Sequence, residues 1–197
     1  CGTIIEPLPL PQFFVKVKPL TDNALSALKK GEVKVIGAGH DKILKHWLEN
    51  LKDWNISRQI VWGIRIPVWY STSENPDLEL HFTDDGKRVS GKISQLLQHY
   101  SLETIIQTLQ ELRPPMNAKF VVSIDSPGPD YIQETDTFDT WFSSAQWPYT
   151  SLQAHNDQDF ARFYPTQVME TGYDILPFWV MRMLMMGLFK TNQVPFQ

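Results

Sequence analysis

Residues 167–189 read Gln-Val-Met-Glu-Thr-Gly-Tyr-Asp-Ile-Leu-Pro-Phe-Trp-Val-Met-Arg-Met-Leu-Met-Met-Gly-Leu-Phe. This stretch predicts a short strand at 167–169, a turn at Gly172 and a long apolar helix over 175–189. The helix is shorter than the ~20 residues that cross a membrane, and Arg182 interrupts it, so we expect it to be buried. A strand, a glycine turn and a buried helix are typical of one βα unit of a parallel sheet, which favours the α/β class.

The rest of the chain continues this alternation of helix and strand patterns. Apolar spacing predicts a first helix that is capped by Thr21 and stops near Gly31, and a second helix that is capped by Asp41. The sequence Asp84-Asp85-Gly86 predicts a hairpin. We also expect strands at 12–17, 33–36 and 119–124, and helices at 93–100 and 101–112, the second of them capped by Ser101.

Composition excludes several classes of protein. The chain has 197 residues, of which 42% are hydrophobic and 20% charged, which is a globular balance that excludes disorder and coiled coil. The formal net charge of −4 argues against a dedicated nucleic-acid clamp, which would be basic overall. The lone cysteine, Cys1, excludes a disulfide within the chain and a Cys-rich zinc site. A chain that begins with this residue could be a lipid-anchored binding domain or a piece excised from a longer protein.

Two groups of residues are candidates for a ligand site around the 167–189 stretch. If 167–169 is a strand, Glu170, Gly172 and Asp174 lie at its carboxyl end, where open α/β sheets bind ligands. The alternative is that Asp174 only caps the following helix and that Glu170 is a solvated acid. Trp141 and Trp179 are candidates for an aromatic pocket, with Ile175 one helical turn before Trp179. Plain core packing is the alternative explanation for all three side chains.

A Trp- and Arg-rich segment suggests a second kind of site. Arg58 and Arg65 flank Trp62-Gly63, and arginine with interleaved aromatic residues suits nucleic-acid phosphates and bases. The alternative, which we favour from the residues alone, is a joint between domains that is held by salt bridges and Trp packing. The five histidines have no metal-ligand spacing, so no metal site is predicted. A serine hydrolase is also disfavoured, because Ser143 and Ser144 lack the G-x-S-x-G motif.

Four blocks of the sequence resemble the valyl-tRNA synthetases, a class I aminoacyl-tRNA synthetase family, and they occur in the family order. They are Cys1–Leu8 with Gln12–Lys16, then Trp54–Tyr70, then Asp139–Ser144, and finally Glu170–Leu176. The isoleucyl and leucyl families fit less well. The sequence departs from the family at Ile64, where histidine is usual, and at Pro177, where aromatic residues are common.

The resemblance implies a parent enzyme that activates valine with ATP to valyl-adenylate and transfers it to tRNA(Val). Trp141, Ile175 and Trp179 would line the valine side-chain pocket, and Glu170, Gly172 and Asp174 would hold the adenylate. Such an apolar pocket rejects threonine poorly. ATP and Mg²⁺ would act as substrate of the parent enzyme, and no bound metal is expected in this chain.

The resemblance also implies how the chain is organised. The fold would be the C-terminal half of a class I Rossmann catalytic domain with connective-peptide segments. Residues 1–52 would end the editing insertion and return to the catalytic body, 53–70 would form a junction, 71–130 an α/β insert, and 131–197 the second half of the Rossmann domain.

The family's His-Ile-Gly-His signature is expected before Cys1 and its Lys-Met-Ser-Lys-Ser signature after Gln197. We therefore expect no catalytic residue in this stretch and no activity of the chain alone. The family is cytoplasmic and has no membrane association. A dimer could cover an exposed sheet edge. Besides the lipid-anchored domain, the alternative is a non-enzymatic tRNA-binding or regulatory relative.

Overall fold

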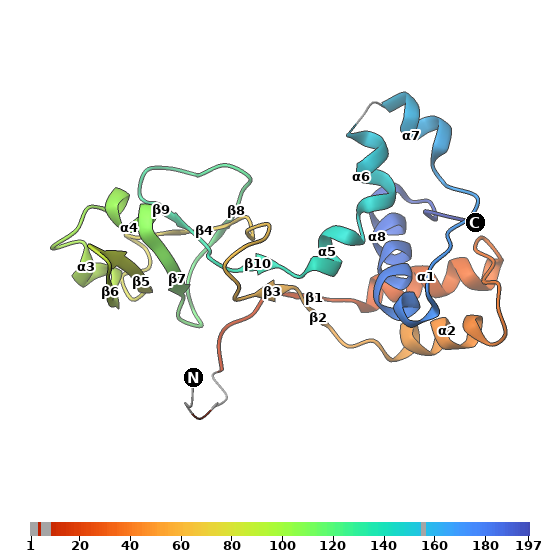
Figure 1. The fold of residues 1–197 in the computed structure, drawn as a ribbon, viewed down its shortest axis with the longest axis horizontal. Helices are drawn as coiled ribbons and strands as arrows, with labels where there is room; N and C mark the ends of the chain where they lie inside the picture. The colour runs from red at the N-terminus through yellow and green to blue at the C-terminus, as the bar shows by residue number, and fades with distance from the viewer. Residues whose placement is uncertain (1–3, 5–8, 155–156) are drawn as a thin grey trace. The chain divides into compact units, whose positions relative to one another are not determined.

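The computed structural model describes residues 4, 9–154 and 157–197, and it divides the chain into two compact units. Unit 1 comprises residues 1–13 and 57–138, and unit 2 comprises residues 14–56 and 139–197. The chain therefore passes from one unit to the other three times. Helices and strands occur together along the chain (Figure 1), as the α/β class predicts.

Unit 2 is mainly helical. Its core contains α8 packed against α1, and three methionines of α8, Met181, Met183 and Met185, are fully buried there. Figure 1 shows α8 beside α1 and α2. The elements of unit 2 are β1 (Phe14–Val15), α1 (Lys18–Lys30), α2 (His40–Asn50), β2 (Trp54–Asn55), α5 (Thr140–Ser144), α6 (Trp147–Gln153), α7 (Asp157–Phe163), a 3₁₀ turn η1 (Tyr173–Ile175), a π-helical turn η2 (Leu176–Val180) and α8 (Met181–Thr191).

Unit 1 is mainly β-structure. Two three-stranded antiparallel sheets, ordered β8-β4-β9 and β6-β5-β7, surround a second core that includes Tyr70, Phe82 and Ile132. The elements of unit 1 are β3 (Ser57–Arg58), β4 (Val68–Ser71), β5 (Glu79–Asp84), β6 (Lys87–Lys92), α3 (Ile93–Leu96), α4 (Leu102–Thr108), β7 (Leu109–Arg113), β8 (Val121–Val122), β9 (Tyr131–Gln133) and β10 (Thr137–Phe138).

Several predicted boundaries are confirmed. The hairpin joins β5 to β6 through Asp85 and Gly86, which have φ angles of 44° and 73° and so form a left-handed turn. The first helix ends at Gly31, whose φ of 74° places it in the left-handed conformation of a glycine C-cap. Ser101 caps α4, because its side chain accepts the backbone N–H of Thr104.

Two predicted caps are wrong. The first helix begins at Lys18 rather than after Thr21, since Pro19 suits the first turn and the Thr21 hydroxyl donates to the Lys18 carbonyl. The second helix begins at His40 after Gly39, and Asp41 lies inside its first turn, where its carboxylate is 3.5 Å from the Lys45 ammonium.

Other corrections come from tertiary packing. The helix predicted for 101–112 ends at Thr108, and Leu109–Arg113 instead becomes strand β7, which pairs with the central strand β5. The helix predicted for 93–100 covers only Ile93–Leu96, and the strand predicted for 119–124 only Val121–Val122. For β7, pairing with the neighbouring strand overrode the local helical pattern.

The strands predicted at 33–36 and 167–169 are wrong for the described residues. Neither segment pairs with another strand there, although Thr166 forms an isolated parallel bridge with Phe196. All ladders between the named strands of the described residues are antiparallel. No helix of these residues is long and apolar enough to cross a membrane.

Candidate functional site

The site in unit 2 starts from Asp139, the first residue of the Asp-Thr-Trp-Phe-Ser-Ser block. Its buried carboxylate accepts the indole N–H of Trp54 at 2.8 Å and the backbone N–H of Trp141 at 3.4 Å. The second bond makes Asp139 the N-cap of α5, the short helix that carries Trp141. The backbone N–H of Asp139 donates to the carbonyl of Ile56 at 2.7 Å. The Asp139 carboxylate thus fixes the start of α5 and, with it, the position of Trp141.

The Trp141 indole stacks on Phe178, a residue that the sequence did not single out. The ring centroids of Trp141 and Phe178 are 6.2 Å apart with an interplanar angle of 26°, and Phe178 also contacts Trp47 at 6.1 Å. Trp47 and Phe178 are each 42% exposed. We call Trp47, Trp141 and Phe178 the aromatic cluster.

The three predicted pocket residues all lie in unit 2 and are half-buried. Trp179 packs behind α5, because its indole N–H donates to the Ser144 carbonyl at 3.0 Å. Trp141 and Trp179 pack against the same hydrophobic core. Ile175 ends the 3₁₀ turn that precedes η2. The structure thus brings Trp141 and Trp179 to α5, whereas no described contact joins Ile175 to either of them.

The sequence missed Phe178 because the prediction assumed regular α-helical spacing. Residues 176–180 form a π-helical turn, with hydrogen bonds to the fifth residue, so the angles between successive side chains differ from those of an α-helix. Pro177 lies at the start of this turn. The signal in the sequence was Pro177 itself, since a proline inside a helical pattern marks a local break.

A cavity of about 470 Å³ lies between the loop after α1 and the segment that leads into η1. Two segments that belong to no helix or strand, 33–36 and 167–172, form much of its lining, which is mainly apolar. Glu170 and Gly172 line it, but Asp174 does not. The alternative role of Asp174 as a cap of the following helix is wrong, since Asp174 lies inside η1 and no side chain caps that turn.

Two aromatic rings at this cavity were missed by the sequence analysis. His40, from α2, stacks on Tyr173 with centroids 6.1 Å apart and an interplanar angle of 11°. Both rings line the cavity, and Tyr173 is 73% exposed. A planar ligand could stack on these rings. The spacing of residues in the sequence does not reveal the pair, because the two rings come from residues far apart in the chain.

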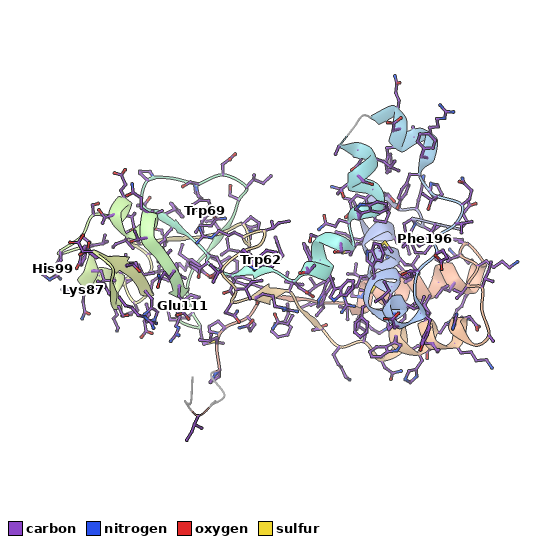
Figure 2. The ribbon with its side chains drawn as sticks, in the orientation of Figure 1. Trp62, Trp69, Lys87, His99, Glu111 and Phe196 are labelled. Atoms are coloured by element: carbon purple, nitrogen blue, oxygen red, sulfur yellow. The ribbon has the colours of Figure 1, made fainter. Side chains whose placement is uncertain are left out.

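Unit 1 brings Arg58, Arg65 and Trp62 into one small region. Arg58 on β3 and Arg65 both pair with Thr137, which therefore lies between them. The loop between them projects Trp62, which is 80% exposed (Figure 2). Gly63 has a φ of 141° and lies against Thr137, where a Cβ would be only 3.0 Å from the Thr137 Cβ. A glycine is needed there to form the loop.

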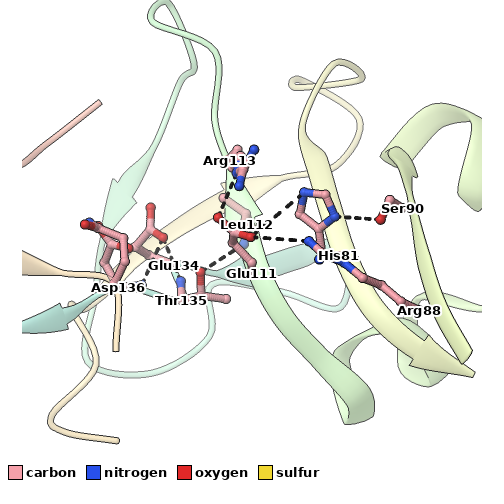
Figure 3. Close-up of polar contacts among 10 residues, drawn as sticks. His81, Arg88, Ser90, Glu111, Leu112, Arg113, Glu134, Thr135 and Asp136 are labelled. Carbon is pink, nitrogen blue, oxygen red and sulfur yellow. Dashed lines mark hydrogen bonds and ion pairs between the residues drawn. The ribbon is translucent and has the colours of Figure 1, made fainter. Parts of the chain in front are cut away.

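Unit 1 also holds a buried acidic pair, Glu134 and Asp136 (Figure 3). Glu134 accepts the Tyr70 hydroxyl at 2.9 Å and the backbone N–H groups of Thr135 and Asp136 at 2.7 and 3.1 Å. Burial raises the pKa of Glu134, although these hydrogen bonds oppose the shift. Burial likewise raises the pKa of Asp136, whereas the hydrogen bond that the Gln59 amide donates to the Asp136 carboxylate at 2.7 Å opposes this shift.

These shifts predict a pH dependence of unit 1. An acid whose pKa is higher in the folded state stabilises the fold below its unfolded pKa and loses that contribution as the pH rises through the folded pKa. We therefore expect Glu134→Gln, which cannot ionise, to become more stable relative to wild type as the pH rises from about 4 to 7. Urea unfolding at several pH values measures this. A stability difference that stays flat or falls over this range would contradict it.

A polar network on the neighbouring sheet crosses three strands (Figure 3). The Nδ1 atom of His81 on β5 lies 2.6 Å from the Ser90 hydroxyl on β6, and its Nε2 atom is 4.0 Å from the Glu111 carboxylate on β7. Glu111 also accepts from Arg113 at 2.7 Å. Burial lowers the pKa of His81, against the attraction of Glu111. This network connects side chains of three strands that are paired through their backbones, and the described residues contain no cluster of three metal-ligating side chains.

Comparison with known proteins gives a consistent family. The model for "tRNA synthetases class I (I, L, M and V)" matches residues 5–197. The valine–tRNA ligase of Borreliella burgdorferi is 40% identical over all of this chain and 18% of its own length. The corresponding enzyme of Fusobacterium nucleatum is 37% identical over all of this chain and 19% of its own length. That of Deinococcus radiodurans is 38% identical over 98% of this chain and 18% of its own length. The chain spans less than a fifth of the length of these relatives.

Proposed function

Because the chain belongs to the class I tRNA synthetases (I, L, M and V), we propose that it is part of a valine–tRNA ligase, an enzyme that activates valine with ATP and transfers it to tRNA(Val). The relatives named above support valine as the amino acid. ATP and Mg²⁺ would enter together as substrate. The enzyme would act in the cytoplasm, without a membrane anchor. The lipid-anchored alternative rests on Cys1, which lies outside the described residues.

The observation that carries this proposal is the placement of Trp141. Asp139 anchors α5 so that the Trp141 indole meets Phe178, and half-buried Trp179 packs against the same core and bonds to Ser144 of α5. We assign the side chain of valine to this apolar surface, with Trp141, Ile175 and Trp179 as its walls. An aromatic wall binds branched methyl groups without any polar partner, which suits valine.

We assign the adenylate to the segment 170–174. Glu170 and Gly172 line the 470 Å³ cavity, and Asp174 follows on the 3₁₀ turn, where its exposed carboxylate could accept from ribose hydroxyls. The His40–Tyr173 stack gives this cavity a flat aromatic surface of the kind that contacts a purine.

We also propose that 131–197 and the end of 1–52 form the C-terminal half of a Rossmann catalytic domain, with 53–70 as the junction and 71–130 as the insert. The segments 33–36 and 167–169 support this, since both have the composition of strands and line the same cavity. Within unit 1, exposed Trp62 with Arg65 would contact tRNA, the indole stacking on an unpaired base. Arg58, across Thr137, would support the same contact or a joint between domains.

The assignment of valine is tested by saturation-transfer NMR on this chain. We expect the methyl protons of L-valine to receive saturation from the protein and those of D-valine to receive much less. Trp141→Ala should reduce the transfer several-fold, because it removes one wall of the pocket. Trp69→Ala, in unit 1, is the matched control and should leave the transfer unchanged. Equal transfer to both enantiomers, or no effect of Trp141→Ala, would count against the assignment.

The same preparation tests whether the chain acts alone. We expect ATP–pyrophosphate exchange at background, since the groups that stabilise the phosphates in this family are expected outside residues 1–197. Exchange clearly above background that depends on valine would show the chain to be an enzyme by itself.

A further inference from the structure

Arg182 lies on the first turn of α8, directly after the π-helical turn η2. Its Nη1 atom donates to the carbonyl of Pro177 at 3.1 Å and to that of Phe178 at 2.8 Å. Both carbonyls belong to η2, the turn whose register decides which aromatic side chain faces Trp141. One guanidinium nitrogen therefore bridges two consecutive carbonyls within this turn, those of its second and third residues.

The same guanidinium lies against two aromatic rings. Its Cζ atom is 4.6 Å from the ring centroid of Trp54 and 6.0 Å from that of Phe178. Both distances are within the range of cation–π attraction, which is stronger where the cation is partly desolvated, as half-buried Arg182 is.

These contacts form a closed ring of interactions that includes Trp141. Arg182 holds Phe178 and Trp54, Trp54 donates to Asp139, and Asp139 caps the helix of Trp141, which stacks on Phe178. Every member lies in unit 2. The two ends of the aromatic stack, one on α5 and one on η2, are thus both connected to a single side chain.

We propose that Arg182 is the positioning residue of the amino-acid pocket: it fixes the π-helical register of η2 and so sets Phe178 against Trp141. The relation to valine rests on the proposed function, whereas the positioning of Phe178 does not. Phe178 accordingly becomes a fourth wall of the pocket, one that Arg182 presents. If Arg182 only filled space, an uncharged side chain of the same length would serve. The two hydrogen bonds to carbonyls and the positive charge over two rings indicate a more specific role.

Fluorine NMR of the chain labelled with 5-fluorotryptophan tests this directly. The seven tryptophans give seven signals, each assigned by a Trp→Phe substitution. Phe178→Leu marks where the Trp141 signal lies without its stacking partner. We expect Arg182→Met, which keeps the apolar part of the side chain and removes the guanidinium group, to move the Trp141 signal toward that position. The Trp62 and Trp69 signals of unit 1 should stay in place.

A matched control separates positioning from general loss of an arginine. Arg162→Met removes another arginine of unit 2, which lies over the Phe163 ring at 5.1 Å, and should leave Trp141 unmoved. If Arg182→Met does not fold, Arg182→Lys decides, because a compact ammonium on a shorter side chain reproduces the contacts with the two carbonyls and two rings only in part and should move Trp141 in the same direction by less. A Trp141 signal that stays at its wild-type position in the folded variants, while only Trp54 moves, would overturn the proposal.

Titration with L-valine then separates the two claims. We expect valine to shift the Trp141 signal of wild type and to bind Arg182→Met about tenfold more weakly, because a pocket whose Phe178 wall is no longer held in place must reorder when valine binds. If wild type does not respond to valine, the assignment of valine to this chain fails, while the ligand-free spectra still decide the role of Arg182. If valine binds both proteins equally although Trp141 has moved, Phe178 is not a wall of the pocket.

Discussion

Asp139→Ala should lower the free energy of unfolding of unit 2 by about 3 kcal/mol. The substitution leaves the buried indole N–H of Trp54 without the acceptor that now lies 2.8 Å away, which costs about 1–3 kcal/mol. It also removes the N-cap of α5, which costs about 1 kcal/mol more. Urea unfolding followed by tryptophan fluorescence measures the loss, because Trp54 and Trp141 both report on this unit.

Asp139→Asn is the control for this prediction. The amide keeps one acceptor oxygen, so it can still serve Trp54 or the cap but not both, and we expect a loss of roughly half as much. If alanine and asparagine cost the same, the carboxylate would not act through these two bonds. If neither costs more than about 0.5 kcal/mol, α5 would be held by its packing alone.

Phe82→Ala should be the most damaging single change in unit 1, with a loss of about 3–5 kcal/mol. Phe82 lies on the central strand β5, is fully buried and meets the Tyr100 ring edge-on at a centroid distance of 5.1 Å. The alanine would lose this contact and leave a cavity inside the core. Because the hydrophobic cores of the two units contain different residues, unit 2 should keep its own stability.

Phe82→Leu fills most of the same volume and should cost only about 1 kcal/mol. Two fluorine signals follow the units separately in urea, Trp69 for unit 1 and Trp179 for unit 2. An equal shift of both transitions in Phe82→Ala would show that the two cores unfold together. A loss no greater than that of Phe82→Leu would show that the core collapses around the missing ring.

The fold could be predicted where local chemistry decides it. Gly31, Asp85-Gly86 and Ser101 fix a helix end, a hairpin and a cap through their own backbone preferences, and all three are confirmed. Leu109–Arg113 could not be predicted, because its apolar spacing suits a helix and only the open edge of β5 makes it a strand. Segments 33–36 and 167–169 have strand composition but no partner strand among the described residues.

The candidate site follows the same division. Trp141 could be found because the motif around it is continuous in sequence and begins with its own N-cap. Phe178 could not, since the angle at which it projects depends on a single π-helical turn and not on composition. His40 and Tyr173 meet only in three dimensions, from elements more than 130 residues apart in the chain.

The bond from the Asp139 N–H to the Ile56 carbonyl also bears on how such a chain can be rebuilt. It places the last residue before the 57–138 segment and the first residue after it 2.7 Å apart, N to O, so the two ends of this segment enter and leave at one point. Because the fold already holds the two ends of this segment together, a change in the segment's length alters the entropic cost of closing the loop only slightly. The position between Ile56 and Asp139 is therefore suited to the removal or insertion of a domain. A tight two- or three-residue turn could replace everything between Ile56 and Asp139, and a foreign domain with adjacent termini could be seated there.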